Sequence, residues 1–159
     1  MTLKLTAGGV SSWTSISLTA GDFNSLADGS FVLLDGTIDN GTNLDLLAEI
    51  AGTVTVGGTT VARSMMPLFL LPEHQDTSTY GDGTTDGTNA PNSAYWCATL
   101  GARVGITSGN VCKMVTPRPF LLTRGIHKIG VQNKLTVALH STASAAFYIR
   151  TTNLNPGAT

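Results

Sequence analysis

The most informative shortage in this sequence is charge. Charged residues make up only 12% of the 159 residues, about half the share that is usual for soluble proteins. The formal net charge is -1, and the nine lysines and arginines are spread over the whole chain. A protein that binds nucleic acid through its phosphates needs a basic patch, so we expect no nucleic-acid partner. A surface with few ionised groups can instead be covered by another protein at little desolvation cost.

Long hydrophobic runs are also missing. The longest apolar run, residues 65–71, is interrupted by Pro67 and is far shorter than the roughly 20 residues of a transmembrane helix. Residues 1–6 lack the apolar segment of a signal peptide. We therefore expect a protein that does not associate with membranes and that is made and used without classical secretion.

Cysteine is scarce. Cys97 and Cys112 are the two cysteines, and they fit neither a metal-binding spacing nor a Cys-x-x-Cys motif. Two free thiols are the favoured interpretation, and a disulfide is the alternative. A disulfide is less favoured if the protein matures in a reducing cytoplasm.

In place of charge, the polar residues are mainly threonine, serine, asparagine and glycine. Threonine is β-branched and favours strands, whereas the other three favour turns. Short apolar or alternating segments lie between turn signals such as Asn40-Gly41. The predicted strands are residues 13–18, 30–38, 44–56, 60–71, 94–106, 111–115 resumed by 120–123, 126–132, 135–140 and 145–151.

Two segments require a choice between helix and strand. Residues 44–50 have helical propensity, but the alternation of residues 53–56 continues them and Asn40-Gly41 precedes them, which favours a strand. In residues 22–29, Asp22 is a suitable N-cap and Gly29 a suitable stop. This segment is the one short helix that we expect.

Eight or nine strands at short, regular spacing, with hairpin turns and one short helix, predict an all-β fold. The expected architecture is a single two-sheet β-sandwich that is jelly-roll-like. We assign residues 1–11 to an N-terminal arm, either frayed or pinned onto a neighbouring subunit, and 12–152 to the β-sandwich domain. Residues 153–159 are expected to form a flexible C-terminal tail.

The sequence contains no convincing catalytic or metal-binding motif. His74, between Glu73 and Asp76, is compatible with a metal site or with the acid–base pair of a hydrolase, but a solvated loop histidine is the favoured interpretation. His127 and His140 are expected at the surface or rim. No nucleophile elbow or phosphate-binding loop is present, and the Asp- and Gly-rich residues 80–87 fail the EF-hand pattern. We therefore expect no enzyme activity, no catalytic residue and no cofactor.

The aromatic residues leave two interpretations open. We expect Trp13 and Trp96 to be core anchors, but together with Tyr80 and Tyr95 they are also suited to stack on a sugar. Residues 72–92 form a long polar stretch around Tyr80, and a loop of this length inside a compact domain is often functional.

Three stretches together resemble small virion proteins of tailed bacteriophages, of the capsid-decoration or head-fibre kind. They are Ser12–Ile16 (SWTSI) leading into Asp22–Gly29 (DFNSLADG), then Ile38–Leu46 (IDNGTNLDL), then Thr79–Gly83 (TYGDG) before Tyr95–Trp96. The resemblance spans roughly residues 12–151. Its motifs are turn and core residues, so they carry no catalytic residue over to this chain.

The resemblance implies a jelly-roll-like structural protein on a virion, assembled in the host cytoplasm. Its expected function is that of a capsid decoration (cement) protein that binds the major capsid protein or other virion proteins as a homo-oligomer, with a trimer as the expected order. The alternative is a carbohydrate- or receptor-binding module of a phage tail or fibre. The candidate interface residues are Leu3, Leu5, Tyr80, Asp82 and Tyr95.

Overall fold

A computed structural model describes residues 5–41, 45–74, 79–81 and 91–156 of the chain. Within these ranges the protein is almost entirely β-structure, so the predicted all-β class is confirmed. None of the helices in these ranges is long and apolar enough to span a membrane. The elements are β1 (Leu5–Val10), β2 (Thr14–Ile16), η1 (Ala20–Phe23), β3 (Phe31–Asp39), β4 (Leu47–Thr55), β5 (Met65–Pro72), η2 (Ser93–Tyr95), β6 (Trp96–Gly101), β7 (Val111–Val115), β8 (Phe120–Leu121), β9 (Ile126–Gln132) and β10 (Ala145–Pro156).

The strand pairing is that of a long antiparallel hairpin that has been rolled up. Strands from the first half of the chain pair with strands from the second half, as β2–β10, β3–β9, β4–β7 and β5–β6. Rolling adds the pairs β4–β10 and β5–β9. Sheet A then has the order β1-β10-β4-β7, with β2 also on β10 and β8 also on β4, and sheet B has the order β3-β9-β5-β6. This connectivity is a jelly roll, as the sequence predicted.

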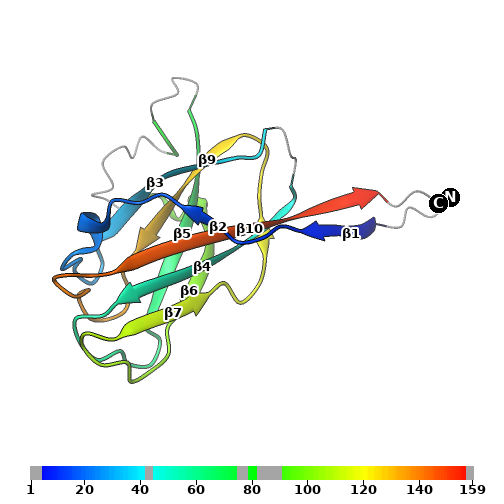
Figure 1. Ribbon diagram of the computed structural model, residues 1–159. Coiled ribbons are helices and arrows are strands. Elements are labelled where there is room, and N and C mark those ends of the chain that lie inside the picture. The colour runs from blue at the N-terminus through cyan, green and yellow to red at the C-terminus, as the bar shows by residue number, and fades with distance from the viewer. Residues whose placement is uncertain (1–4, 42–44, 75–78, 82–90, 157–159) are drawn as a thin grey trace.

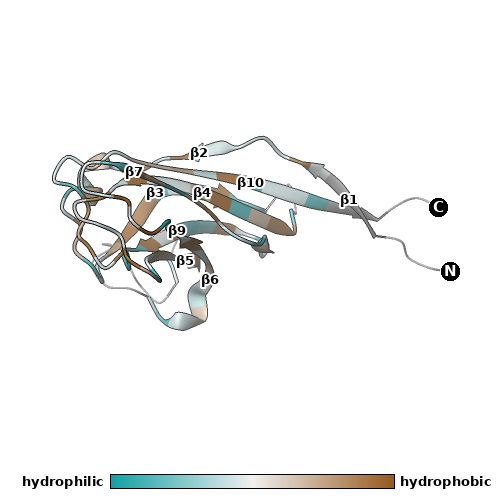
Figure 2. Ribbon diagram, turned by 90° about the horizontal axis from the view of Figure 1, so that it is seen from below, coloured by the Kyte–Doolittle hydropathy of each residue, from teal (hydrophilic) through white to brown (hydrophobic). Residues whose placement is uncertain are grey.

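The core lies between the two sheets, which Figure 2 shows as two layers. Alternation along the strands directs one set of side chains inward: β7 buries Cys112 and Met114 and exposes the three residues between and beside them. Ile50 of β4 and Ile129 of β9 have no exposed surface. At the end of the core, the rings of Phe23 and Phe147 lie 5.5 Å apart between centroids.

The predicted helix over residues 22–29 is wrong in position and type. The structure has a single 3-10 turn, Ala20–Phe23, which is enough to bury Phe23. The chain then leaves the helical conformation, because Asn24 is extended and Ser25 has a φ of 53°. Tertiary partners take the backbone groups that a longer helix would use, since Ser25 N donates to His140 O. A second 3-10 turn, η2, was not predicted.

The predicted strand over residues 135–140 is also wrong. Apart from an isolated bridge between Val56 and Leu139, this segment is an irregular loop that buries Leu135 and Leu139. The Asn133 side chain organises it, accepting from Leu135 N at 3.0 Å and donating to Val137 O at 3.0 Å. The apolar alternation therefore reflected two buried leucines in a loop rather than a strand.

The two ends of the described chain form a two-stranded ribbon. β1 pairs with the end of β10, from Val10↔Thr152 to Leu5↔Pro156. Figure 1 shows this ribbon projecting away from the sandwich. Residues 153–156, from the predicted tail, are the last residues of β10, and residues 5–10, from the predicted arm, pair with this end of β10. The pairing escaped the sequence analysis because neither segment has an apolar period.

Candidate functional site

Three of the five candidate interface residues, Leu5, Tyr80 and Tyr95, lie in the described part of the chain. Leu3 and Asp82 lie outside the described residues. Leu5 begins β1 and is paired with Pro156 in the terminal ribbon. Tyr80 and Tyr95 pack against Phe31 and Phe69 of sheet B, so the three described candidates lie in two separate regions of the molecule.

Tyr80 is a packing residue rather than an exposed contact. Its side chain is only 8% exposed and packs with Phe31, Phe69 and Leu71, and Tyr95 packs against the same group. Burial, with help from the Glu73 carboxylate, raises the pKa of the Tyr80 hydroxyl. The Lys128 ammonium lies 5.0 Å from the centroid of the ring. Tyr80 therefore fastens the long polar loop to sheet B.

His127 was expected at the surface, and that prediction is wrong, because the side chain is only 1% exposed. β9 lies between β3 and β5, where His127 is opposite Ile38 and Pro72. Its Nε2 and the Thr123 hydroxyl share a hydrogen bond of 2.8 Å, whereas Nδ1 is buried without a partner. Burial lowers the pKa of His127, and the nearby backbone of Gly125 and Ile38 opposes part of that shift.

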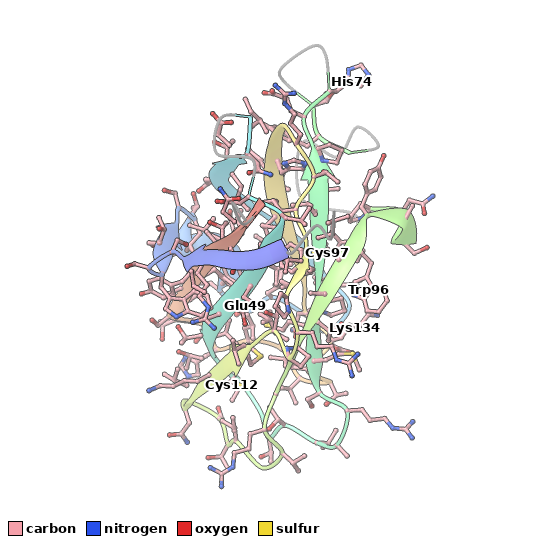
Figure 3. The ribbon with its side chains drawn as sticks, turned by 90° about the vertical axis from the view of Figure 1, so that its right-hand side faces the viewer. Glu49, His74, Trp96, Cys97, Cys112 and Lys134 are labelled. Atoms are coloured by element: carbon pink, nitrogen blue, oxygen red, sulfur yellow. The ribbon has the colours of Figure 1, made fainter. Side chains whose placement is uncertain are left out.

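Metal-binding and thiol chemistry find little support in the structure. Among the described residues, no three His, Cys, Asp or Glu side chains gather where a metal ion could bind; Asp76, the predicted neighbour of His74, lies outside them. Both cysteines are free, as predicted, and they stand apart in Figure 3. Burial raises the pKa of the Cys97 thiol to about 12, so this thiol is not activated as a nucleophile.

Both tryptophans were expected in the core, and both are exposed, Trp13 by 39% and Trp96 by 58%. Trp96 turns outward because a bulge interrupts the register between β5 and β6, where Phe69 pairs with Trp96 directly after Leu68 pairs with Ala98. Its Nε1 donates to the Thr99 hydroxyl at 3.2 Å. The alternation around β2 already placed Trp13 on the face opposite Ile16, which is buried.

Trp13 lies on the outer face of sheet A, which combines exposed apolar residues with few charges. One row across this face, from β2 to β7, is Ser15, Tyr148, Ala51 and Val115. The large apolar side chains exposed on sheet A or just beside it include Trp13, Val111, Val115, Leu121 and Tyr148, between 38% and 57% exposed. Isolated exposed apolar residues are ordinary, but a group on one face marks an interaction surface.

The charged residues of this face are arranged around Trp13. Glu49 and Arg150 are directly opposite each other on β4 and β10, and Arg150 Nε donates to Glu49 Oε2 at 2.6 Å. That hydrogen bond raises the pKa of the guanidinium. The guanidinium lies over the Trp13 ring, 4.7 Å from its centroid. The ion pair thus keeps a cation against an exposed indole.

Beside Trp13 the face is hollowed into a shallow groove of about 420 Å³. Its floor consists of small residues of β4, and it is lined by Trp13, Ala51, Gly52, Thr53, Lys113, Met114 and Tyr148. Sequence reasoning considered Trp13 as a sugar-stacking residue but missed Tyr148 and Lys113. The alternation of β10 and β7 was the signal that places these two side chains on the same side of the sheet.

The comparisons with known proteins give no further guidance, because no family model, no curated protein and no solved structure matches this chain.

Proposed function

We propose that the protein is a non-enzymatic structural component of a bacteriophage virion. More specifically, the protein would be a capsid decoration protein that binds the shell surface as a homo-oligomer. The resemblance of residues 12–151 to small virion proteins motivates this assignment. The observation that carries the proposal is the terminal ribbon, because it projects from the sandwich and leaves strand edges open to pairing.

The ribbon offers backbone groups for pairing with another chain. β4 accompanies β10 only as far as Leu47↔Thr152, whereas β1 follows β10 to Pro156. In the described part of the chain, β10 beyond Thr152 therefore has one strand neighbour, and the outer edge of β1 has none. Unpaired strand edges are templates for adding a strand from a partner. The virion partner would attach to this ribbon.

The low surface charge supports the same function. Copies that carry a net charge of only -1 repel one another weakly when they crowd on a shell. Polar residues such as threonine and serine also lose less solvation than ionised groups when a neighbour covers them. A protein that binds a shell in many copies benefits from both effects.

The test is binding to capsids of the phage whose genome encodes the protein. The full chain should co-sediment with these capsids in a fixed number of copies, and a chain that lacks residues 1–11 should bind much less. Val104→Ala, at a side chain that is 57% exposed in the β6–β7 loop, is the matched control and should bind normally. If the truncated chain binds as well as the full chain, the ribbon is not the attachment element.

Size-exclusion chromatography with light scattering tests the oligomer separately. A stable trimer agrees with the decoration function. If the protein is a monomer and fails to sediment with capsids, the virion proposal is refuted.

A further inference from the structure

The groove on the outer face of sheet A has features that the virion proposal does not use. Trp13 is exposed, yet it is held in place: Glu49 fixes Arg150, and Arg150 lies over the indole. A cation over an aromatic ring stabilises the pair and restricts both side chains. A rigid exposed aromatic residue reduces the entropy lost when a ligand binds, so this arrangement is that of a prepared binding surface.

The groove also has the size of a small-molecule site. Tyr148 lies opposite Ala51 and Lys113 lies opposite Thr53, so larger side chains flank small ones on β4. The volume of about 420 Å³ falls within the range of small-molecule sites, roughly 300–1,000 Å³. A ligand lying on β4 would contact the aromatic side chains on one side and Lys113 on the other.

Three polar side chains, Thr53, Lys113 and Tyr148, line the groove. Within the ranges that the structure describes, the hydroxyls of Tyr148 and Thr53 and the ammonium of Lys113 make no hydrogen bond or ion pair. Covering them with an apolar peptide or an apolar protein face would leave them desolvated and unpaired, which is unfavourable. The occupant that suits them brings its own hydrogen-bonding groups.

We propose that this groove binds a saccharide. A pyranose ring presents an apolar C–H face, which fits the exposed aromatic side chains Trp13 and Tyr148, and a rim of hydroxyls. Those hydroxyls accept hydrogen bonds from the Lys113 ammonium, and they either donate to or accept from the hydroxyls of Thr53 and Tyr148. The site is independent of the terminal ribbon, so it stands whether or not the protein is a virion component.

The test uses an immobilised panel of neutral oligosaccharides built from glucose, galactose, mannose and N-acetylglucosamine. The strongest binder is then titrated by isothermal calorimetry against the full chain. Trp13→Ala should weaken binding by about tenfold or more, because it removes an aromatic stacking surface. Lys113→Met and Tyr148→Phe, which remove polar groups alone, should each weaken it several-fold.

Trp96→Ala is the matched control. Trp96 is the other exposed tryptophan, and it lies on β6 in sheet B, away from Glu49 in Figure 3. This variant should bind like the unmodified protein, and far-UV circular dichroism should show that all variants remain folded. If no member of the panel binds at millimolar concentration, or if Trp13→Ala binds as tightly as the unmodified protein, the proposal is overturned.

Discussion

Replacing Gly52 by alanine should destabilise the protein, although alanine is ordinarily the better residue in a strand. Gly52 lies in the middle of β4, directly opposite Phe147 on β10 and Met114 on β7. A Cβ at this position would lie 2.7 Å from Phe147 Cε1 and 3.0 Å from a methyl group of Leu100. Favourable contacts between carbon atoms begin at about 3.5 Å, so at least one neighbour must move.

The neighbours have little room to move. Phe147 and Leu100 have no exposed surface, and Phe147 already packs against Phe23. Overpacking a close-packed core costs about 1–3 kcal/mol. Alanine recovers roughly 0.5–1 kcal/mol because it restricts the unfolded chain more than glycine does. The net expectation is a loss of about 1–2 kcal/mol in the free energy of unfolding.

Urea denaturation with Gly101→Ala as the matched control measures this effect. Gly101 ends β6, and a Cβ there meets nothing within 4 Å. The control should therefore gain about 0.4–1 kcal/mol. For a protein of this length, each kcal/mol shifts Tm by about 2–4 °C, so the two variants should move Tm in opposite directions. If Gly52→Ala is as stable as the unmodified protein, the packing between β4 and β10 is not as described.

Three further predictions concern buried side chains. The unmodified protein should lose stability as the pH falls below about 6.5, because His127 binds a proton more readily in the unfolded chain than in the folded protein, where its pKa is lowered. Urea denaturation from pH 8 to 5.5 should show a smaller loss of stability in His127→Leu, and an equal loss would contradict the lowered pKa of His127. Cys97, a half-buried thiol whose pKa is raised to about 12, should react with a disulfide reagent at pH 8 much more slowly in the native protein than in the unfolded one, and equal rates would contradict the raised pKa. Tyr80→Ala should cost about 3 kcal/mol in a thermal denaturation assay while Tyr80→Phe costs little, and equal effects would mean that the ring is not packed.

The sequence predicts the strands correctly in segments whose alternation of apolar and polar residues depends only on their own residues. Residues 47–55 form strand β4 even though residues 44–50 have helical propensity, because alternation and a preceding turn outweigh propensity. Residues 126–132 match β9 at both ends. In these segments the inward-facing positions are apolar, except for His127 on β9, so the period of two is visible without any knowledge of the partners.

The predictions from sequence fail where contacts with distant segments of the chain determine the structure. A single bulge opposite Leu68 and Phe69 turns Trp96 outward, and nothing near Trp96 in the sequence reports the register of β5. His127 is buried because β9 is a central strand, which is a property of the strand order. The Asn133 side chain organises residues 135–137 into a loop through hydrogen bonds that mimic backbone pairing. Sequence pattern carries no information on these contacts.

The ribbon and the groove share β10, yet they can be tested separately. β10 contributes Tyr148 and Arg150 to the groove region and residues 152–156 to the ribbon. Around the groove, β10 is held by β2 on one side and β4 on the other, whereas β1 contacts it only from Thr152 onward. Removing residues 1–11 therefore takes away the partner of the ribbon and the hydrogen bonds between Ser11 and Thr151, and it leaves β2 and β4, the two neighbours of Tyr148, in the chain. A truncated chain that no longer sediments with capsids but still binds the same oligosaccharide would assign attachment to the ribbon and recognition to the groove.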